Sequence, residues 1–423
     1  MPSAISTIIT EHLPSLDSYE PLYKHLHANP ELSFQEKETA ARIVEELGKF
    51  PVEIHSGIGG HGIAAVLKNG EGKAVLLRAD FDALPVEELT GLPYASKKRM
   101  VDLEGNEKPV MHACGHDMHV ACLLAATELM VKAKEKWSGT LILCFQPAEE
   151  KGAGAQAMVD DGLYDKIPKP DIVLGGHVFP MRAGVIGTKK GTVMSAADSF
   201  HITMHGRGSH GSQPHRSVDP VVMAASTVMR LQSVISRETN PEDFAVLTVG
   251  ALNVGDAENV IPAKAELKIN IRNFNAETRP RVIEGIKRIV NAESLASNAP
   301  APPDIKETTA FPLTINDEDV TTKVTEVFTE HFPPAPHGFL PDTGRLFGSE
   351  DFGILGSAIG RPYCYFVYGG TDPEVWDKAI KEGKATEVVP VNHSPFFAPV
   401  IQPTMRVGVE GYTASALTWL IKQ

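Results

Sequence analysis

The first part of the chain contains short, almost uniformly apolar runs separated by segments of helix-like composition. Three of these runs end in residues with reactive side chains: KAVLLRADFD (73–82), GTLILCFQPAEE (139–150) and PDIVLGGH (170–177). Strands of a parallel sheet that is covered on both faces have this apolar character, and their carboxyl ends are where α/β domains bind ligands. The runs therefore predict parallel strands that bring five side chains to one edge of a sheet: Asp80, Asp82, Glu149, Glu150 and His177.

The pattern changes near residue 191. The segments DSFHITMHG (198–206) and AKAELKINIRNF (263–274) alternate between apolar and polar positions, as strands with one exposed face do. Helical segments are expected at about 220–237 and 277–296. The resulting order, roughly β-α-β-β-α, indicates a small ferredoxin-like sandwich.

A proline-rich stretch, SNAPAPPDIKE, follows this region and is expected to be a linker. After it, RPYCYFVYGG has the character of another buried strand, and the C-terminal segment has that of a helix. We therefore predict an α/β domain interrupted by an inserted α+β domain. The expected boundaries are residues 1–190 and 306–423 for the α/β domain and 191–305 for the insert.

Charge and cysteine content narrow the functional classes. The net charge of -13, without a long Lys/Arg block, argues against nucleic-acid and anionic-membrane partners. No apolar run approaches the roughly 20 residues that span a bilayer, and the N-terminus lacks the pattern of a secretory signal. The four cysteines are too few and too scattered for a disulfide framework, so a reducing, cytoplasmic location is expected.

The segment MHACGHDMH, at 111–119, concentrates residues that bind metals. Cys114 and His116 are two apart in a glycine-containing turn, just before the helix expected at 117–136. A thiolate with an imidazole suits zinc or a neighbouring transition metal better than magnesium or calcium. His177 follows an apolar run, and His393 lies in VPVNHSPFF after the last expected strand.

Glu149 and Glu150 are adjacent at the end of an apolar run. Two such carboxylates allow a division of labour, in which one binds a metal and the other moves protons. The alternative is a solvated helix start, because acidic residues favour the first turn.

Several of these segments together resemble a known family. LHANPELSFQE, LLRADFDALP, MHACGHDMH, FQPAEE, the Gly-Gly-His at His177 and NHSPFF occur in order from residue 25 to the C-terminus. They resemble the branch of the dinuclear metallopeptidases that contains aminoacylases, hippurate hydrolases and indole-acetyl-amino-acid amidohydrolases. The resemblance covers nearly the whole chain. It implies a zinc-peptidase-like catalytic domain with an inserted lid and dimerisation domain.

The resemblance also implies a ligand set and a general base. Two divalent ions, chosen among Zn, Mn, Co and Ni, are expected to be held by Cys114, His116, Glu150, His177 and His393. Glu149 is expected to be the general base, and Asp82 to support a metal-ligand histidine. Many relatives have a metal-binding histidine where this chain has Asp80, and an aspartate near the position of Cys114 and His116. The bridging ligand and the preferred metal therefore stay open.

The same resemblance extends into the insert. It implies that His210 reaches across a homodimer to steady the oxyanion, and that Asn259 and Arg272 hold the free carboxylate of the substrate. From the residues alone, His210 can equally be a loop histidine and Arg272 an exposed strand residue. GSEDF (348–352) resembles a motif that lines the pocket, and its alternative role is a helix N-cap. His25 and His27 are assigned to structure.

These features predict a metal-dependent hydrolase whose small-molecule substrates are N-acyl amino acids or similar small amides. The resemblance implies that it forms a homodimer. A dipeptidase or carboxypeptidase with the same metals is the alternative. A metal-dependent ligand-binding protein without turnover is a further alternative, which the presence of Glu149 with the full ligand set disfavours.

Overall fold

The computed structural model describes residues 2–422, and the chain divides into two compact units. The core unit comprises residues up to Val193, Ile315–Arg345 and the chain from Asp351 onwards. The inserted unit comprises Met194–Thr314 and Leu346–Glu350. The chain leaves the core unit along β9 (Gly191–Met194) and returns along β16 (Thr314–Asn316).

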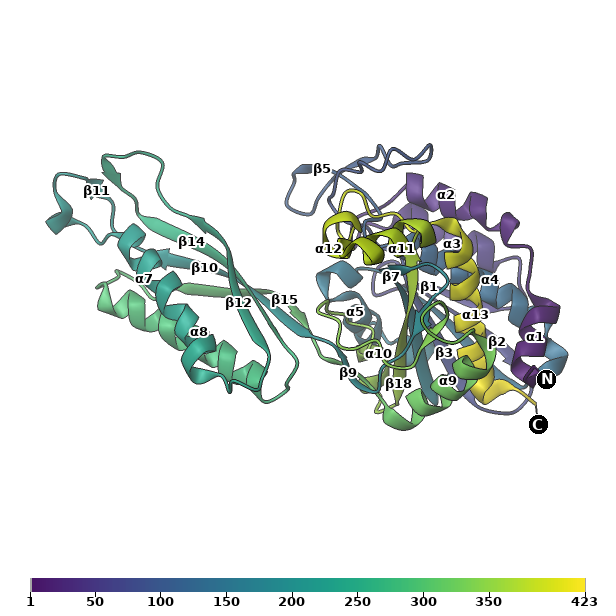
Figure 1. The fold of residues 1–423 in the computed structure, drawn as a ribbon. Helices are drawn as coiled ribbons and strands as arrows, with labels where there is room; N and C mark the ends of the chain where they lie inside the picture. Colours follow the sequence, from purple (N-terminus) through teal and green to yellow (C-terminus); the bar gives the residue numbers. More distant parts are fainter. Residues whose placement is uncertain (1, 423) are drawn as a thin grey trace. The chain divides into compact units, whose positions relative to one another are not determined.

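The core unit is built on an eight-stranded sheet with the order β1-β2-β6-β3-β7-β18-β8-β17 (Figure 1). The four central strands run parallel, which confirms the parallel arrangement predicted from the apolar runs. They are almost entirely buried, because helices cover both faces. The strand bounds are β1 (Glu53–Ile58), β2 (Gly62–Asn69), β3 (Ala74–Asp80), β6 (Gly139–Gln146), β7 (Ile172–Arg182), β8 (Ile186–Gly187), β17 (Phe339–Leu340) and β18 (Tyr363–Thr371).

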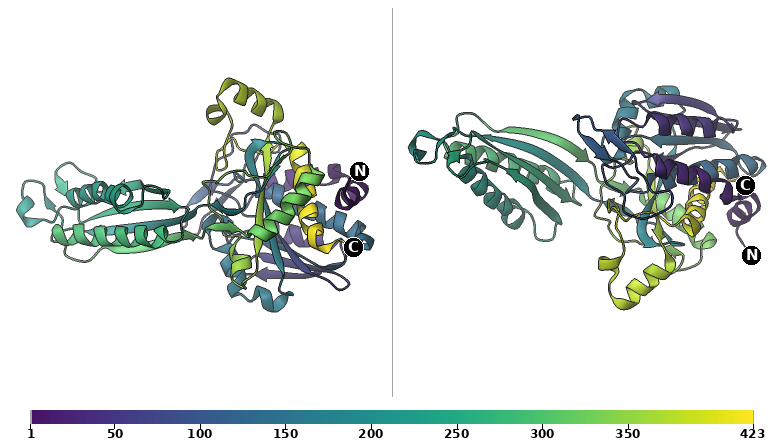
Figure 2. Two further views of the ribbon diagram at one scale, coloured as in Figure 1. Left: turned by 60° about the horizontal axis from the view of Figure 1, so that its bottom comes forward. Right: turned by 90° about the horizontal axis from the view of Figure 1, so that it is seen from above.

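Helices cover both faces of this sheet (Figures 1 and 2). The two that contact the central strands most directly on one face are α4 (His116–Lys132) and α13 (Ile401–Leu420). The same apolar core includes residues of α1 (Ala4–His12), α2 (Glu20–Ala28), α3 (Lys37–Leu47) and α9 (Glu318–His331). On the other face lie α5 (Gly154–Asp160) and α10 (Ile354–Ser357).

Shorter elements complete the core unit. They are β4 (Arg99–Val101) and β5 (Glu107–Pro109), which form a hairpin, the 3₁₀ turn η3 (Glu149–Lys151), and the helices α6 (Leu163–Lys166), α11 (Pro373–Glu382) and α12 (Ala385–Val388). The predicted helix at 117–136 is α4 followed by a short 3₁₀ turn at Lys134–Lys136. Almost every residue of α4 is buried, consistent with its richness in alanine and leucine.

The inserted unit is a four-stranded antiparallel sheet with the order β12-β14-β10-β15. Its two helices pack on one face of this sheet (Figure 1). Buried residues alternate with partly exposed ones along β10 and β14, as predicted from their sequence. The element order β-α-β-β-α-β is ferredoxin-like. The bounds are β10 (Ala196–His205), α7 (Pro220–Ser233), β12 (Ala245–Asn253), β14 (Lys264–Asn273), α8 (Thr278–Ala296) and β15 (Asp304–Phe311).

The return from the insert differs from the expected linker. Only the proline-rich part of SNAPAPPDIKE lies outside regular structure, because Asp304–Phe311 forms β15 and pairs with β10. The inserted unit therefore extends beyond the boundary expected at residue 305, up to Thr314. Prolines before a strand do not prevent pairing, since proline lacks an N–H and disrupts the ladder only at positions where a backbone N–H must donate.

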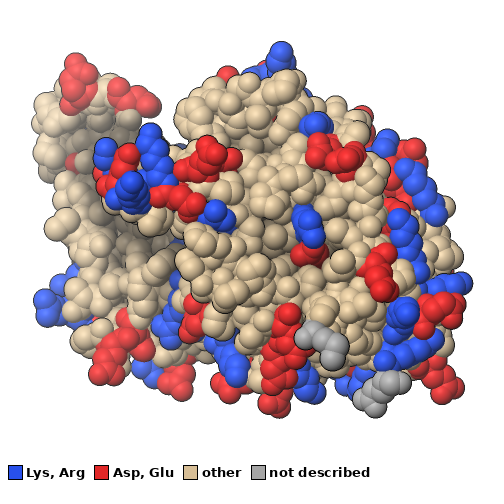
Figure 3. Space-filling view, turned by 45° about the vertical axis from the view of Figure 1, so that its right-hand side comes forward, with Lys and Arg blue, Asp and Glu red and all other residues tan. Residues whose placement is uncertain are grey.

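Charged side chains are mixed on the face drawn in Figure 3, where basic and acidic residues lie interspersed without a continuous basic area. Among the helices of residues 2–422, none is both long and apolar enough to cross a membrane.

Candidate metal centre and active site

The carboxyl ends of β3 and β6 lie beside the start of α4. Asp80 is the last residue of β3, and Glu149 and Glu150 follow β6 in η3. Between Cys114 and His116, Gly115 has a φ of 83°, and a Cβ atom there would lie 2.5 Å from a methyl carbon of Val178. The turn that carries the cysteine and histidine therefore requires glycine.

Five of the predicted site residues come together in the core unit. The Sγ atom of Cys114 lies 3.5 Å from Nε2 of His177. Oε1 of Glu150 lies 3.9 Å from Nε2 of His116, and its Oε2 lies 3.4 Å from Nε2 of His393. We call these five residues the histidine–cysteine cluster. Four are buried or nearly so, whereas the side chain of His393 is 55% exposed.

The two buried histidines of this cluster are oriented in the same way. His116 donates from Nδ1 to the carbonyl oxygen of Asp82 at 2.9 Å, and His177 donates from Nδ1 to the carbonyl of Val178 at 2.7 Å. Each ring therefore presents Nε2 to the cluster. Nε2 of His116 and Oε1 of Glu150 are buried and have no hydrogen-bond partner among residues 2–422. Histidines that bind metals have this arrangement, with one nitrogen hydrogen-bonded and the other open.

The electrostatics of the cluster favour a cation. Burial raises the pKa of the Cys114 thiol to about 12 and that of Glu150 to about 8. Burial also lowers the pKa of His116, but the nearby Asp80 and Cys114 outweigh it, so that this pKa is raised well above its usual value. The acidic neighbours that raise this pKa would also stabilise a metal cation at Nε2 of His116. A thiol, imidazoles and a carboxylate with open lone pairs fit a transition-metal site.

Glu149 lies beside Glu150 and is itself buried, with Oε2 4.0 Å from Nε2 of His116. The turn before it is unusual, because Ala148 has a φ of 50° although it is not a glycine. The carboxylate of Glu36 accepts the N–H of Ala148 at 2.9 Å and stabilises this conformation. Non-glycine residues in this backbone region are often found at functional sites.

Asp82, which is expected to support a metal-ligand histidine, contacts two members of the cluster, His116 and Glu150. Its Oδ2 accepts the hydroxyl of Ser33 at 2.7 Å and the N–H of Glu150 at 3.0 Å. Its Oδ1 lies 3.3 Å from Nδ1 of His116. Asp82 therefore constrains one histidine and one carboxylate of the cluster at the same time.

The three predicted residues of the inserted unit are not all brought together. His210 is exposed in β11 (Ser209–His210), which pairs with β13 (Val260–Ile261), and Asn259 immediately precedes β13. Arg272 lies elsewhere in the sheet, where it donates to the carbonyl of Phe347 at 2.9 Å and to Oγ of Ser349 at 3.2 Å.

The strand register shows how far apart these residues are. At one end of the β10–β14 ladder, His205 pairs with Lys264, next to the β11–β13 pair. At the other end, Ala197 pairs with Arg272. This length of strand spans about 25 Å. Within one chain, Arg272 thus lies at the opposite end of the sheet from His210 and Asn259.

Three residues near the cluster were missed in the sequence. His119 lies one turn after His116 in α4, and this spacing of three, which places side chains on one helix face, is the signal that could have found it. Arg78 interrupts an apolar run, and a charge there was a further signal because unpaired charges are rarely buried.

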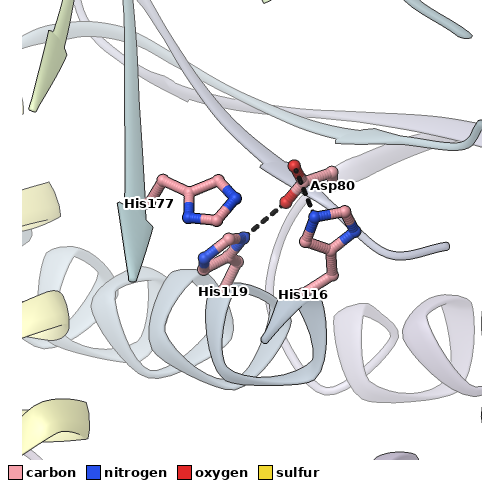
Figure 4. A group of neighbouring side chains, drawn as sticks. All are labelled: Asp80, His116, His119 and His177. Carbon is pink, nitrogen blue, oxygen red and sulfur yellow. Dashed lines mark hydrogen bonds and ion pairs between the residues drawn. The ribbon is translucent and has the colours of Figure 1, made fainter. Parts of the chain in front are cut away.

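Asn392 donates to the carbonyls of Cys114 at 3.2 Å and Val178 at 3.3 Å. Figure 4 shows how His116, His119, His177 and Asp80 face one another.

His25 and His27 differ in environment. His25 is exposed, whereas His27 is buried and contacts Asp117 at 2.7 Å and Glu88 at 2.9 Å. We call His27, Glu88 and Asp117 the His27 cluster. Its complete pairing agrees with the structural role assigned to His27 from the sequence.

Comparisons with known proteins agree on one family. Residues 76–386 match the family described as Peptidase family M20/M25/M40. The hippurate hydrolase of Campylobacter jejuni is 38% identical over 350 residues, which cover 82% of this chain and 87% of that protein. The N-acetyl-L-cysteine deacetylase of Bacillus subtilis is 39% identical over 355 residues, covering 82% and 79% respectively.

A solved structure is similar over almost the whole chain. It is the YXEP protein of Bacillus subtilis, described as a dinuclear metal binding peptidase from the M20 family. The TM-score is 0.71 at 26% sequence identity, and the match covers 95% of this chain and 97% of that protein. Together, the fold, the histidine–cysteine cluster and these relatives define a metal-dependent hydrolase. The chain belongs to peptidase family M20/M25/M40.

Proposed function

We propose that this enzyme hydrolyses the amide bond of N-acyl amino acids, releasing a carboxylic acid and an amino acid. One observation carries the proposal: a buried thiol, imidazoles and a carboxylate with open lone pairs lie next to a second carboxylate, Glu149. The names of the two relatives point to the substrate class, since hippurate and N-acetyl-L-cysteine are both N-acyl amino acids.

The residues that would hold two divalent ions are those of the histidine–cysteine cluster. The distances from Cys114 to His177, and from Glu150 to His116 and His393, support this assignment. The ligand types suit Zn, Mn, Co or Ni. When bound, such a pair of ions supplies Lewis-acid chemistry, which polarises a carbonyl and makes water more acidic.

Glu149 is the proposed general base. Its Oε2 lies 4.0 Å from Nε2 of His116, next to the proposed ligand Glu150, whose Oε2 lies 3.4 Å from Nε2 of His393. In this role it takes a proton from the attacking water and passes it to the leaving amine, and a positioned carboxylate is suited to both steps. Asp82 keeps His116 in place through its carbonyl oxygen and its carboxylate.

We further propose a homodimer in which the partner subunit supplies the residue that steadies the oxyanion, His210 in this chain's numbering. The separation of about 25 Å between the two ends of the inserted sheet supports this arrangement. His210 and Asn259 share one end, so a subunit that contributes one of them contributes the other as well. Arg272, at the other end, has the planar donor geometry that suits a substrate carboxylate.

Mixed dimers test the trans arrangement. His210→Ala subunits combined with Glu149→Gln subunits contain one site in which both residues are intact. Heterodimers purified with two different tags are therefore expected to regain activity that neither parent homodimer has. If verified heterodimers remain as inactive as the parents, the trans role of His210 is wrong.

The proposed substrate class is tested with a panel of N-acyl amino acids and free dipeptides. Release of free amino acid is measured with added Zn, Mn or Co and with a chelator. Faster, chelator-sensitive cleavage of the acylated compounds supports the proposal. Cleavage of dipeptides alone would replace it with a peptidase, and a metal-loaded protein that cleaves nothing would point to a binding protein.

The proposed cellular setting is the reducing cytoplasm. All four cysteines are buried and free, and a thiol ligand such as Cys114 persists best where oxidants are scarce.

A further inference from the structure

A network of buried charged and polar groups lies directly behind the histidine–cysteine cluster. Arg78 donates to Oδ2 of Asp80 at 2.7 Å and to the amide oxygen of Gln146 at 2.9 Å. The amide of Gln146 donates to Oδ1 of Asp351 at 2.6 Å, and Arg78 lies 3.5 Å from the same oxygen. All four side chains are fully buried. Ion pairs so deeply buried add little net stability because of their desolvation cost, so stability alone does not account for this network.

His119 joins this network to the cluster, and both of its ring nitrogens are engaged. The backbone N–H of Val178 donates to Nε2 of His119 at 2.9 Å. Nε2 must therefore be the acceptor nitrogen, and Nδ1 carries the hydrogen that is donated to Oδ1 of Asp80. His116 and His177 also carry a hydrogen on Nδ1, but their Nε2 atoms face the cluster, whereas Nε2 of His119 already accepts a backbone N–H.

His119 consequently has no lone pair to offer a metal, although it lies within ligand distance of the other residues in Figure 4. The carboxylate of Asp80 is also engaged, by His119 on one oxygen and Arg78 on the other. Its Oδ2 lies 3.4 Å from Nε2 of His116, where it adds negative charge to the cluster. The group of four thus contains two candidate ligands, His116 and His177, and two residues already committed to other partners.

We propose that Asp80 and His119 are positioning residues that orient His177, and that neither binds the metal. Asp80 holds His119 in one tautomer, and His119 then anchors the backbone of Val178. The carbonyl of Val178 in turn accepts the Nδ1 hydrogen of His177, and the rings of His119 and His177 pack at a centroid distance of 4.3 Å. The inference rests on the proposed role of His177 as a ligand.

Asp80→Asn is the informative substitution because an amide cannot satisfy both partners. If its oxygen faces His119, its NH₂ group faces the guanidinium of Arg78. If its NH₂ group faces His119, the ring must take the other tautomer, and its Nε2 hydrogen then meets the N–H of Val178. One hydrogen bond is lost in either orientation.

The matched control is Glu410→Gln. Glu410 is also a buried carboxylate between a histidine and an arginine, 3.3 Å from His331 and 2.8 Å from Arg406, and it contacts no residue of the cluster. Metal binding to the apoenzyme is measured by competition with a chromophoric chelator, using Zn alone as the probe. Asp80→Asn is expected to weaken binding about 10- to 100-fold, as loss of outer-shell partners does. Glu410→Gln is expected to leave it unchanged.

Equal affinities in wild type and Asp80→Asn, or equal losses in the two variants, would overturn the proposal. His119→Phe guards against a folding defect at position 80, because it keeps an aromatic ring but no hydrogen bonds. It is expected to weaken Zn binding as well, and wild-type affinity in this variant also contradicts the proposal.

The tautomer of His119 provides a readout that needs neither metal nor substrate. In apoenzyme with ¹⁵N-labelled histidine, the His119 signals, assigned through the His119→Phe variant, are expected to show a hydrogen on Nδ1. A hydrogen on Nε2 would overturn the inference by itself. Failure of the wild-type enzyme to hydrolyse N-acyl amino acids would instead count against the proposed function, and the tautomer result would stand.

Discussion

His116 and Asp117 are neighbours in the chain but belong to two buried polar clusters of opposite character. In the His27 cluster, both nitrogens of His27 have carboxylate partners, at 2.7 and 2.9 Å. In the histidine–cysteine cluster, Nε2 of His116 and Oε1 of Glu150 have no hydrogen-bond partner among the described residues. The two clusters contain similar residue types, so composition does not distinguish them.

The completeness of pairing does distinguish them. Buried polar atoms without partners are costly, and native proteins retain few of them without a reason. The His27 cluster is complete within the protein and stabilises the packing of α2 against α4. The histidine–cysteine cluster is incomplete, and a bound cation would supply what it lacks.

Removal of metal is the strongest way to test this contrast. Dialysis against a chelator is expected to abolish activity, with a loss of at least about 10³-fold in kcat, because carbonyl polarisation by the ions contributes several kcal/mol. Activity should return with Zn, Mn or Co. The measurement is hydrolysis rate against metal content. Full activity in protein shown to be metal-free would mean that the histidine–cysteine cluster does not act by binding metal.

Glu149→Gln separates catalysis from metal binding at the histidine–cysteine cluster. Loss of a general base is expected to lower kcat by about 10²- to 10⁴-fold, while the metal content stays that of wild type. Glu150→Gln is the matched control, because Glu150, the carboxylate next to Glu149, is a proposed ligand and its loss should lower metal affinity. Wild-type turnover in Glu149→Gln would remove Glu149 from the mechanism.

His27→Gln tests whether the His27 cluster contributes to stability without affecting metal binding. Removing one partner of a buried ion pair typically costs about 3–5 kcal/mol, and the side chains of His27, Glu88 and Asp117 are all fully buried. The melting temperature should therefore fall clearly, while the Zn affinity of the folded protein stays the same. A tenfold loss of Zn affinity would show instead that the two clusters are coupled through His116 and Asp117.

The pH dependence of stability tests, with a smaller expected effect, whether His27 is charged within the His27 cluster. Burial lowers the pKa of His27, but Asp117 and Glu88 outweigh it and raise this pKa from 6.5 to about 10. Because the folded-state pKa is the higher one, the stabilisation is fully present below about pH 6.5 and is lost as pH rises toward 10. The difference in melting temperature between wild type and His27→Gln should accordingly shrink from pH 6 to pH 10. A constant difference would contradict a charged His27.

Much of the fold was predictable because burial leaves a clear pattern in sequence. Apolar runs correctly predicted the buried strands β3, β6, β7 and β18. The alternation of apolar and polar residues correctly predicted that β10 and β14 each have one buried face. The strand β15 was not predicted, because prolines precede it and its residues are mostly exposed or half-buried. An edge strand of this kind carries little hydrophobic signal.

The candidate site was predictable only in part. Cys114 and His116 stood out because MHACGHDMH concentrates metal-binding residues, and Glu149 and Glu150 stood out because they follow an apolar run. The roles of His119 and Arg78 were not predictable, because they depend on which atoms lie beside them. The separation of Arg272 from His210 likewise depends on the register of two strands distant from each other in the chain.

The sequence by itself determined the two kinds of sheet, their order along the chain and the set of side chains able to bind metal. These properties are local, since hydrophobic period and residue chemistry can be read over a few positions. Only the tertiary structure decided which histidines have an open nitrogen. His27, His116, His119 and His177 are chemically identical, and the backbone carbonyls, N–H groups and carboxylates that folding places around each ring make them different.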